Sequence, residues 1–195
     1  MRLRVFLGAS ELLGLRDSSY ADPLIAVCQA SGLEFSYRPD LECLFISSPA
    51  AGSLVALRVD EPLSGGLRKR LAELLRGAGA QVLSEVGLVG RRYGDVALEV
   101  SVGRNCQASS VRFPWGNREA RALACSLAGA LDRAGIAVGR PQADLSGLLR
   151  RVPVARVSLC ASDDSTEVQA QSLFLGLTRF LWWRSLFRCQ TPAGA

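Results

Sequence analysis

Short apolar stretches separated by turn-forming residues fill the start of the chain. Residues 2–7 (RLRVFL) alternate polar and apolar side chains, which is the pattern of a strand with one buried face. Residues 22–30 predict a short helix, with Pro23 in its first turn and Gly32 after its end. Two further strand-like runs, LEFSY and ECLFIS, flank a turn that contains proline. We therefore expect residues 1–48 to form a small β-α-β-β module.

After this module, strand-like and helix-like patterns alternate. The predicted strands lie at residues 54–59, 80–86, 95–102 and 153–160. Each predicted helix follows a residue that can cap its amino terminus, namely Ser64, Asn117 and Asp164. Such alternation is typical of a mixed, mostly parallel sheet covered by helices. We expect this α/β domain to extend over residues 54–189, after a linker at residues 47–53 and before a tail at residues 190–195.

The composition favours a globular protein with a hydrophobic core. Hydrophobic residues make up 49% of the 195 positions and charged residues 21%, which argues against disorder. The net charge of +5 comes from scattered arginines, with Lys69 as the single lysine. This surface does not favour a nucleic-acid partner, because neither a basic stripe nor a known binding motif is present. No apolar run is long enough to span a membrane, and charges interrupt residues 1–14 too often for a good signal peptide.

The six cysteines form no CxxC pair, so the sequence offers neither a zinc knuckle nor a thioredoxin motif. Most of them occupy apolar runs, where cysteine behaves as a small hydrophobic residue. Buried free thiols are therefore expected. A disulfide between Cys28 and Cys43 is an alternative that the sequence leaves open.

The strand at residues 95–102 runs into a Gly-Arg-Asn turn, and ligands of α/β sheets bind at the carboxyl ends of strands. From residue 54 to 185, the order of elements resembles the zinc-dependent N-acetylmuramoyl-L-alanine amidases of bacterial cell-wall metabolism. VALRVDEPLSGG stands where that family has a strand and an Asp-x-Gly-His-Gly-Gly loop, and SVGRN where it has Ser-Ile-His-x-Asn. VPVARVSLC stands where it has Pro-Ala-x-Leu-Val-Glu before a long final helix. The first module resembles the copper amine oxidase N-terminal-like module, a name that does not imply copper binding.

The resemblance implies a catalytic zinc ion, yet the residues that would hold it are absent. The chain contains no histidine. The two zinc histidines of the family align with Leu63 and Gly103, and its catalytic glutamate aligns with Ser158. Leucine and glycine side chains ligate no metal, and a serine without a histidine partner is a poor general base. We therefore expect a dismantled site that holds no zinc and no other cofactor.

Other side chains near the predicted strand ends offer an alternative metal site, because carboxylates and thiolates bind zinc. The candidate ligands are Asp60, Glu61, Asp95, Cys106 and Cys160. Solvated turn residues and core cysteines explain them more simply. Helix capping explains the neighbouring carboxylates Asp163 and Asp164 in the same way.

Two groups of side chains are candidates for binding. The first contains residues that can stack on a sugar or hold an anion, namely Arg104, Asn105, Arg112 and Trp115. The second gives the end of the last helix an aromatic and basic surface, formed by Trp182, Trp183, Arg184 and Phe187. Such a surface suits a membrane or a protein partner. The simpler explanations are a tryptophan that covers the sheet edge and a helix end that completes the core.

Together, the residues and the resemblance imply a catalytically inactive, amidase-like protein of peptidoglycan metabolism. It would bind a wall fragment or a cell-wall protein, and the resemblance implies a role in sporulation. The alternatives are an active amidase with a non-standard metal site and an assembly protein that uses its aromatic C-terminal end. By the same resemblance, the expected compartment is the cell envelope or the forespore.

Overall fold

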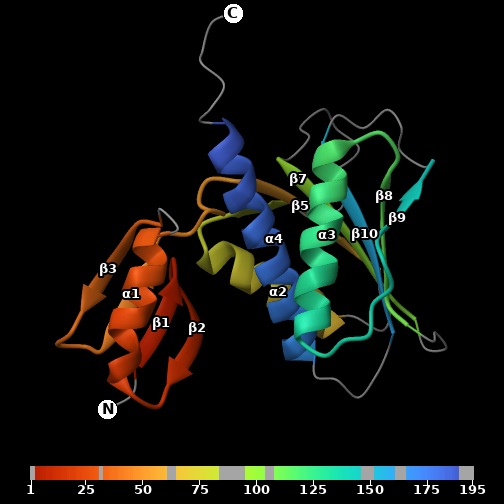
Figure 1. The fold of residues 1–195 in the computed structure, drawn as a ribbon. Helices are drawn as coiled ribbons and strands as arrows, with labels where there is room; N and C mark the ends of the chain where they lie inside the picture. The colour runs from red at the N-terminus through yellow and green to blue at the C-terminus, as the bar shows by residue number, and fades with distance from the viewer. Residues whose placement is uncertain are drawn as a thin grey trace, which may run out of the picture.

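The computed structural model describes residues 3–30, 33–60, 65–83, 95–103, 108–145, 152–160 and 166–188. Two sheets organise these segments (Figure 1). The first has four strands in the order β2-β1-β4-β3, and the second has six in the order β6-β5-β7-β10-β8-β9. Within these segments, no helix combines the length and the apolar character that a membrane crossing requires.

The region that forms the four-stranded sheet contains the predicted β-α-β-β elements and one more strand. Its elements are β1 (Leu3–Leu7), β2 (Ser10–Leu15), the 3-10 helix η1 (Ser18–Tyr20), α1 (Ala21–Ala30), β3 (Phe35–Arg38) and β4 (Cys43–Ile46). The strand absent from the prediction is β2, which pairs antiparallel with β1 across a turn at Gly8 and Ala9. Gly8 has a φ of 61°, a conformation that favours glycine. The apolar residues of β2 do not alternate strictly, which is why the pattern failed to predict it.

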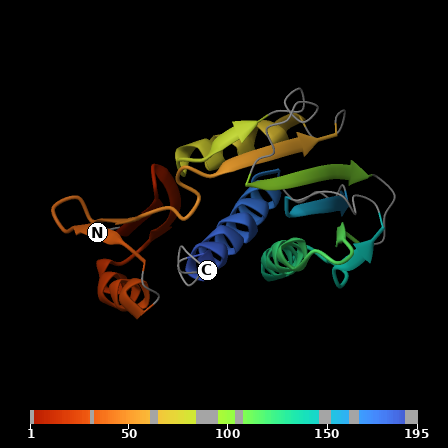
Figure 2. The ribbon, with the colours of Figure 1, turned by 90° about the horizontal axis from the view of Figure 1, so that it is seen from above.

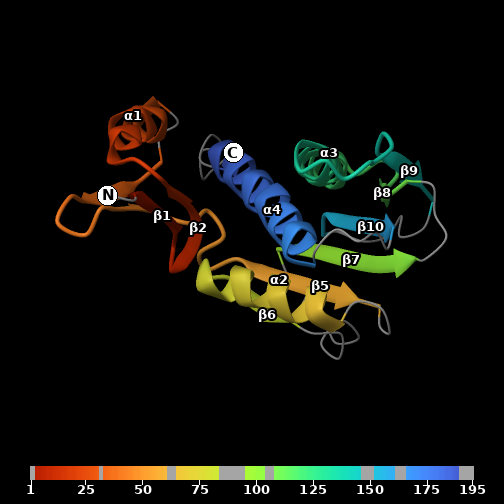
Figure 3. The same cartoon turned by 90° about the horizontal axis from the view of Figure 1, so that it is seen from below.

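The six-stranded sheet is mixed, as predicted. Its elements are β5 (Leu54–Val59), α2 (Gly65–Gly77), β6 (Gln81–Leu83), β7 (Val96–Gly103), β8 (Ser110–Pro114), α3 (Arg118–Arg133), β9 (Gln142–Asp144), β10 (Val154–Cys160) and α4 (Thr166–Arg188). Strands β5, β6, β7 and β10 run parallel, and β8 is antiparallel to β10. The short strands β8 and β9 were not predicted. Figure 3 shows β5, β7 and β10 running in one direction, away from the four-stranded sheet.

The predicted helix starts have different outcomes. Asn117 caps α3, because its side-chain oxygen accepts a hydrogen bond from the backbone N–H of Ala120 at 2.9 Å. Ser64 and Asp164 lie outside the described residues. In the first turn of α4, the carboxylate of Glu167 accepts hydrogen bonds from Arg70 and Gln171.

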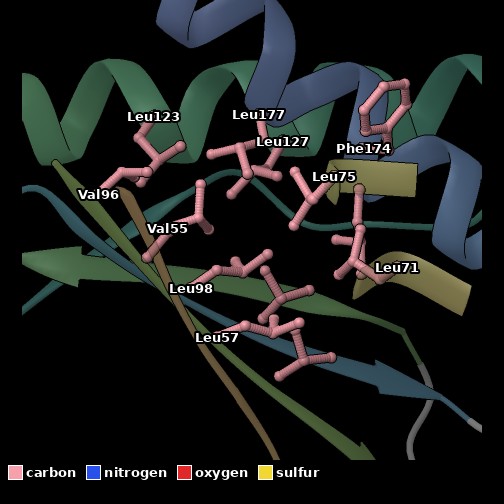
Figure 4. Packing of buried hydrophobic residues seen from close by; sticks show 14 of the residues in the cluster. Val55, Leu57, Leu71, Leu75, Val96, Leu98, Leu123, Leu127, Phe174 and Leu177 are labelled. Atoms are coloured by element: carbon pink, nitrogen blue, oxygen red, sulfur yellow. The ribbon is translucent and has the colours of Figure 1, made fainter. Parts of the chain in front are cut away.

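Helices α2, α3 and α4 pack on one face of the six-stranded sheet and enclose the main core. Helix α4 lies between the other two (Figure 2). Figure 4 shows strand residues such as Val55 and Val96 pointing toward Leu123 and Leu127 of α3. Burial of this continuous apolar face supplies the main force that holds helices and sheet together.

The two sheets also pack on each other through the β1–β2 turn. The backbone N–H of Ala9 donates a 2.8 Å hydrogen bond to the carbonyl of Gly77 at the end of α2. Leu7 and Ala50 are buried in the same core cluster as the helices of the six-stranded sheet. The four-stranded sheet therefore shares a core with the elements that follow it.

Candidate functional site

The second face of the six-stranded sheet carries its side chains in rows that cross the strands. Near the amino ends of β5, β7 and β10, the row Ala56, Ala97 and Val154 is small and buried. Two residues further along each strand, the same face carries a charged row, which consists of Arg58, Glu99 and Arg156 and continues on β8 with Arg112. The next row is made of hydroxyl side chains, namely Ser101, Ser158 and Ser110. The face therefore changes from apolar to charged to polar toward the carboxyl ends of the parallel strands.

Arg156 lies at the centre of this charged row and is neutralised by two carboxylates. Its Nε donates to Glu99 Oε2 at 2.7 Å, and its Nη1 donates to Asp144 Oδ2 at 3.0 Å. Burial disfavours its charge, but the hydrogen bonds to Glu99 and Asp144 outweigh burial and hold the pKa of the guanidinium above its ordinary value. Arg156 is therefore a fixed part of the site.

Arg112 is the cation of the row that has no carboxylate partner among the described residues. It stands directly opposite Arg156 in the β8–β10 pairing, and its side chain is exposed. By contrast, Arg58 is hydrogen-bonded to Asp60 at 3.3 Å.

These side chains line an open depression of about 310 Å³, which we call the polar cleft. Its walls come from the charged row and from Asp60, Asp144, Ser101 and Ser158. The volume is at the lower end of the range for sites that bind small molecules. The cleft can therefore hold a small polar ligand or the end of a longer one.

Gly103 and Ser158, the two described positions that the sequence resemblance sets against amidase catalytic residues, lie on this same face. Gly103 ends β7 and pairs in register with Cys160, the last residue of β10. Ser158 lies in the polar cleft, where its hydroxyl accepts a hydrogen bond from Ser101 at 3.1 Å. Leu63, the third aligned position, lies outside the described residues. The sheet thus brings Gly103 and Ser158 to one edge, as an amidase site would require.

The residues at this edge do not fit a zinc ion. Gly103 has no side chain, Cys160 is disulfide-bonded, and the carboxylate of Asp60 is engaged by Arg58. In the described part of the chain, no three histidine, cysteine or acidic side chains converge on one point. Zinc in proteins requires three or four such ligands.

Three of the alternative metal ligands lie elsewhere or outside the described residues. Asp95 precedes β7, at the opposite end of these parallel strands from Asp60, which follows β5. Its carboxylate accepts a hydrogen bond from the backbone N–H of Leu54 at 3.0 Å. Glu61 and Cys106 belong to segments that the structure does not describe.

The expectation of buried free thiols holds only in part. Cys28 and Cys43 are free and buried, so a disulfide between them is wrong. Burial raises the pKa of the Cys28 thiol. Cys125 is free but exposed, because it lies on the side of α3 that faces away from the core. Cys160 is disulfide-bonded, contrary to the expectation.

The structure separates the members of the first predicted binding group. Arg112 lies in the polar cleft, whereas Arg104 and Asn105 are outside the described residues. Trp115 is 65% exposed and follows β8. Its backbone N–H donates a 2.8 Å hydrogen bond to the carbonyl of Asp144, a residue that lines the polar cleft. Trp115 itself does not line the cleft, and its binding role stays a prediction.

At the end of α4, the predicted surface is partly exposed. Trp183 is 37% exposed and its ring lies 6.0 Å from that of Phe180, while Trp182 is half-buried. Arg184 is not a surface cation, which corrects the prediction. It is only 12% exposed, pairs with Glu119 at 3.2 Å and donates to the backbone carbonyl of Asp95 at 2.6 Å. The side chain of Phe187 lies outside the described set.

Sequence reasoning named Asp60 but missed Glu99, Asp144 and the central Arg156 of the polar cleft. A signal was present, since Glu99 and Arg156 each interrupt a strand whose neighbouring residues are apolar. Charged residues are rarely placed in such strands unless they are paired. Asp144 gave no such signal, because β9 has only three residues.

Comparison with known proteins shows which solved structures have a fold similar to that of this chain. No known family model and no curated protein matches the chain. Among solved structures, this chain is similar to the CwlD amidase from Clostridioides difficile, which was determined in complex with the GerS lipoprotein. The TM-score is 0.56 at 10% identity, and the match covers 67% of this chain and 98% of that chain. The catalytic domain of the CD27L endolysin, which targets Clostridia difficile, matches with a TM-score of 0.53 at 12% identity. This match covers 66% of this chain and 98% of that chain.

Two thirds of this chain has an amidase fold. The fold class predicted from the sequence is therefore confirmed. At such low identity the likeness extends to the arrangement of helices and strands, and the chemistry of the site has to be argued from the residues of the polar cleft.

Proposed function

We propose that the protein is a catalytically inactive, amidase-like module of peptidoglycan metabolism that binds a muropeptide in the polar cleft. The observation that carries this proposal is that Gly103 and Ser158 lie on the same face of the sheet as the charged row. An amidase fold supports the substrate class, and the absence of ligating side chains at these two positions supports inactivity. No zinc and no other cofactor is required for binding.

The chemistry of the polar cleft suits the peptide part of such a ligand. A muropeptide carries free carboxylates and amide groups. The exposed guanidinium of Arg112 offers a two-pronged donor for a carboxylate, and the hydroxyls of Ser101 and Ser158 can exchange hydrogen bonds with amides. The carboxylates that hold Arg156 would repel a second anion, so a ligand anion is directed to Arg112.

Catalysis is tested by incubating the purified protein with purified muropeptides, with and without added zinc. Mass spectrometry then detects cleavage between the lactyl group and L-alanine. We expect no cleavage under either condition, because no general base and no set of metal ligands is available at Ser158 and Gly103. Zinc-dependent cleavage would overturn the inactivity and support an active amidase with a non-standard metal site.

Binding is tested by calorimetric titration of the same muropeptides. We expect Arg112→Ala to weaken binding by about tenfold or more, since a charge-assisted hydrogen-bonded pair is lost. Arg76→Ala is the matched control, because Arg76 is an exposed arginine of α2 that does not line the polar cleft. If the wild-type protein binds no muropeptide, or if both variants bind like the wild type, the polar cleft is not the site.

A second candidate function is assembly with another cell-wall protein. The complex of the CwlD amidase with a lipoprotein favours it, since that amidase has the same fold. The role in sporulation and the location in the cell envelope or forespore belong to this proposal by resemblance only. Purification of the tagged protein from its native cells, followed by identification of a stoichiometric partner, would separate this candidate from a ligand-binding module.

A further inference from the structure

A second concave surface lies between α3 and α4, on the side of α3 that carries no core residue. We call it the helix groove. It has a volume of about 550 Å³ and is lined by Ser126, Gly129 and Arg133 of α3 and by Arg179, Trp182 and Trp183 of α4. The groove does not include the polar cleft, and it lies on the other side of the sheet.

The groove is open because small residues of α3 face the tryptophans. A Cβ atom added to Gly129 would meet only the Nη1 atom of Arg133, at 3.6 Å. The hydroxyl of Ser126 donates a 2.8 Å hydrogen bond to the carbonyl of Gly176 and is therefore satisfied within the protein. A ligand on the floor of the groove therefore needs to supply few hydrogen-bond partners.

Two cations border this apolar floor. Arg133 and Arg179 are exposed, and neither makes an ion pair with a residue that the structure describes. Arg184, on the same helix as Arg179, is neutralised by Glu119. The helix groove thus combines two indole rings with two guanidinium groups that have no ion-pair partner among the described residues. Its positive charge favours an anionic ligand.

We propose that the helix groove binds an amphipathic anion, which is a molecule with one phosphate, sulfonate or carboxylate group attached to an apolar or aromatic body. The guanidinium groups of Arg133 and Arg179 would hold the anionic group through charge-assisted hydrogen bonds. The indole rings of Trp182 and Trp183 would cover the apolar body. The volume lies within the range of small-molecule sites, and a concave surface suits one enclosed molecule better than a flat membrane.

The test uses the fluorescence of Trp182 and Trp183 in the full chain carrying Trp115→Phe, which removes the third tryptophan. Three probes are titrated: dihexanoyl phosphatidylglycerol below its micelle-forming concentration, naphthalene-2-sulfonate, and the zwitterionic dihexanoyl phosphatidylcholine. We expect saturable binding of at least one anion and at least about tenfold weaker binding of the zwitterion. Binding of the lipid anion alone would indicate a lipid as the natural ligand, and binding of the sulfonate would indicate a soluble aromatic anion.

Variants then locate the binding. The double variant Arg133→Ala and Arg179→Ala should weaken anion binding by about tenfold or more, whereas Arg121→Ala, an exposed arginine of α3 outside the groove, should change it by less than about twofold. Gly129→Leu should block the groove while the helix remains intact, as judged by thermal unfolding. The proposal is overturned by an absence of anion binding in the wild type. It is equally overturned by a zwitterion that binds as well as the anions, or by unchanged binding in the double variant or in Gly129→Leu.

Discussion

The two faces of the six-stranded sheet are built from the same strands but serve different purposes. On one face, residues such as Val55, Leu57 and Leu98 are buried under α2, α3 and α4. On the other face, the intervening positions carry Arg58, Glu99 and Arg156. Because successive side chains of a strand alternate between faces, one residue packs in the core and the next contributes to the polar face.

This comparison separates the residues that hold the fold from those that line the polar cleft. The fold depends mainly on the apolar face, which requires no particular residue at Gly103 or Ser158. Substitutions at exposed positions of the polar face are therefore expected to cost less stability than substitutions in the core. The predictions that follow test this division by perturbing first the apolar face and then the polar contacts.

The largest expected effect is on the apolar face. Phe174→Ala should lower the free energy of unfolding by about 3–5 kcal/mol, because it empties space at the centre of α4 where the ring is only 1% exposed. Leu175→Ala, at the next position and 47% exposed, is the matched control and should cost less than about 1 kcal/mol. Urea unfolding curves measure both. Equal losses in the two variants would mean that α4 is not packed as described.

The contact between α3 and α4 is tested by a pair of glycine substitutions. A Cβ atom at Gly176 would lie 2.8 Å from the Cα of Leu127, so the helices would have to separate. We expect Gly176→Ala to destabilise the protein by about 1–3 kcal/mol in spite of the better helix propensity of alanine. At Gly129 a Cβ atom makes only an ordinary contact, 3.6 Å from Nη1 of Arg133, so Gly129→Ala should be neutral or stabilise by up to about 1 kcal/mol. The midpoint of thermal unfolding should therefore fall for Gly176→Ala, and it should rise or stay unchanged for Gly129→Ala.

The sequence predicted the parts of the fold that have strong periodicity. The strand at residues 54–59 and the helix capped by Asn117 were predicted because burial on one side imposes a regular pattern. Strands β2, β8 and β9 were missed, since short strands at or near a sheet edge need few buried residues and leave little pattern. Their positions depend on pairing partners far away in the sequence.

The candidate site was less predictable than the fold. The sequence could place Gly103 and Ser158 near each other because both lie in the carboxyl-terminal parts of predicted strands. The neutralisation of Arg184 by Glu119 was not, because the two are 65 positions apart and only the packing of α3 on α4 brings them together. Arg112 was named as a binding residue, but its place opposite Arg156 follows from a strand that the pattern did not reveal.

On the polar face, Arg156→Gln is expected to have an intermediate effect. It leaves the carboxylates of Glu99 and Asp144 without their shared cation, in an environment where each of the three side chains is about one-quarter exposed or less. We expect a loss of about 1–2 kcal/mol. Arg58→Gln should cost less, because Arg58 and Asp60 are both about half exposed. Urea unfolding measures the two losses. A loss for Arg156→Gln as large as that for Phe174→Ala would contradict the division between the faces.

The smallest expected effect concerns Arg70 and Glu167, which join α2 to α4 at the rim of the apolar face. Arg70 donates two hydrogen bonds to the carboxylate, at 2.7 and 2.8 Å, and these lower the pKa of Glu167. A carboxyl whose pKa is lower in the folded state stabilises the protein above its unfolded pKa, and this contribution disappears as the pH falls through the folded value. At pH 7, Glu167→Gln should cost about 0.5 kcal/mol, because both side chains are about 40% exposed and solvent screens the pair. The free energies of unfolding of the variant and the wild type, measured between pH 7 and pH 3, should converge as the pH falls.

Glu73→Gln is the control, because it removes a single longer contact to the same Arg70. Its free energy of unfolding should differ less from that of the wild type at pH 7. A difference that grows toward acid would mean that Glu167 is stabilised as the protonated acid, contrary to its pairing with Arg70.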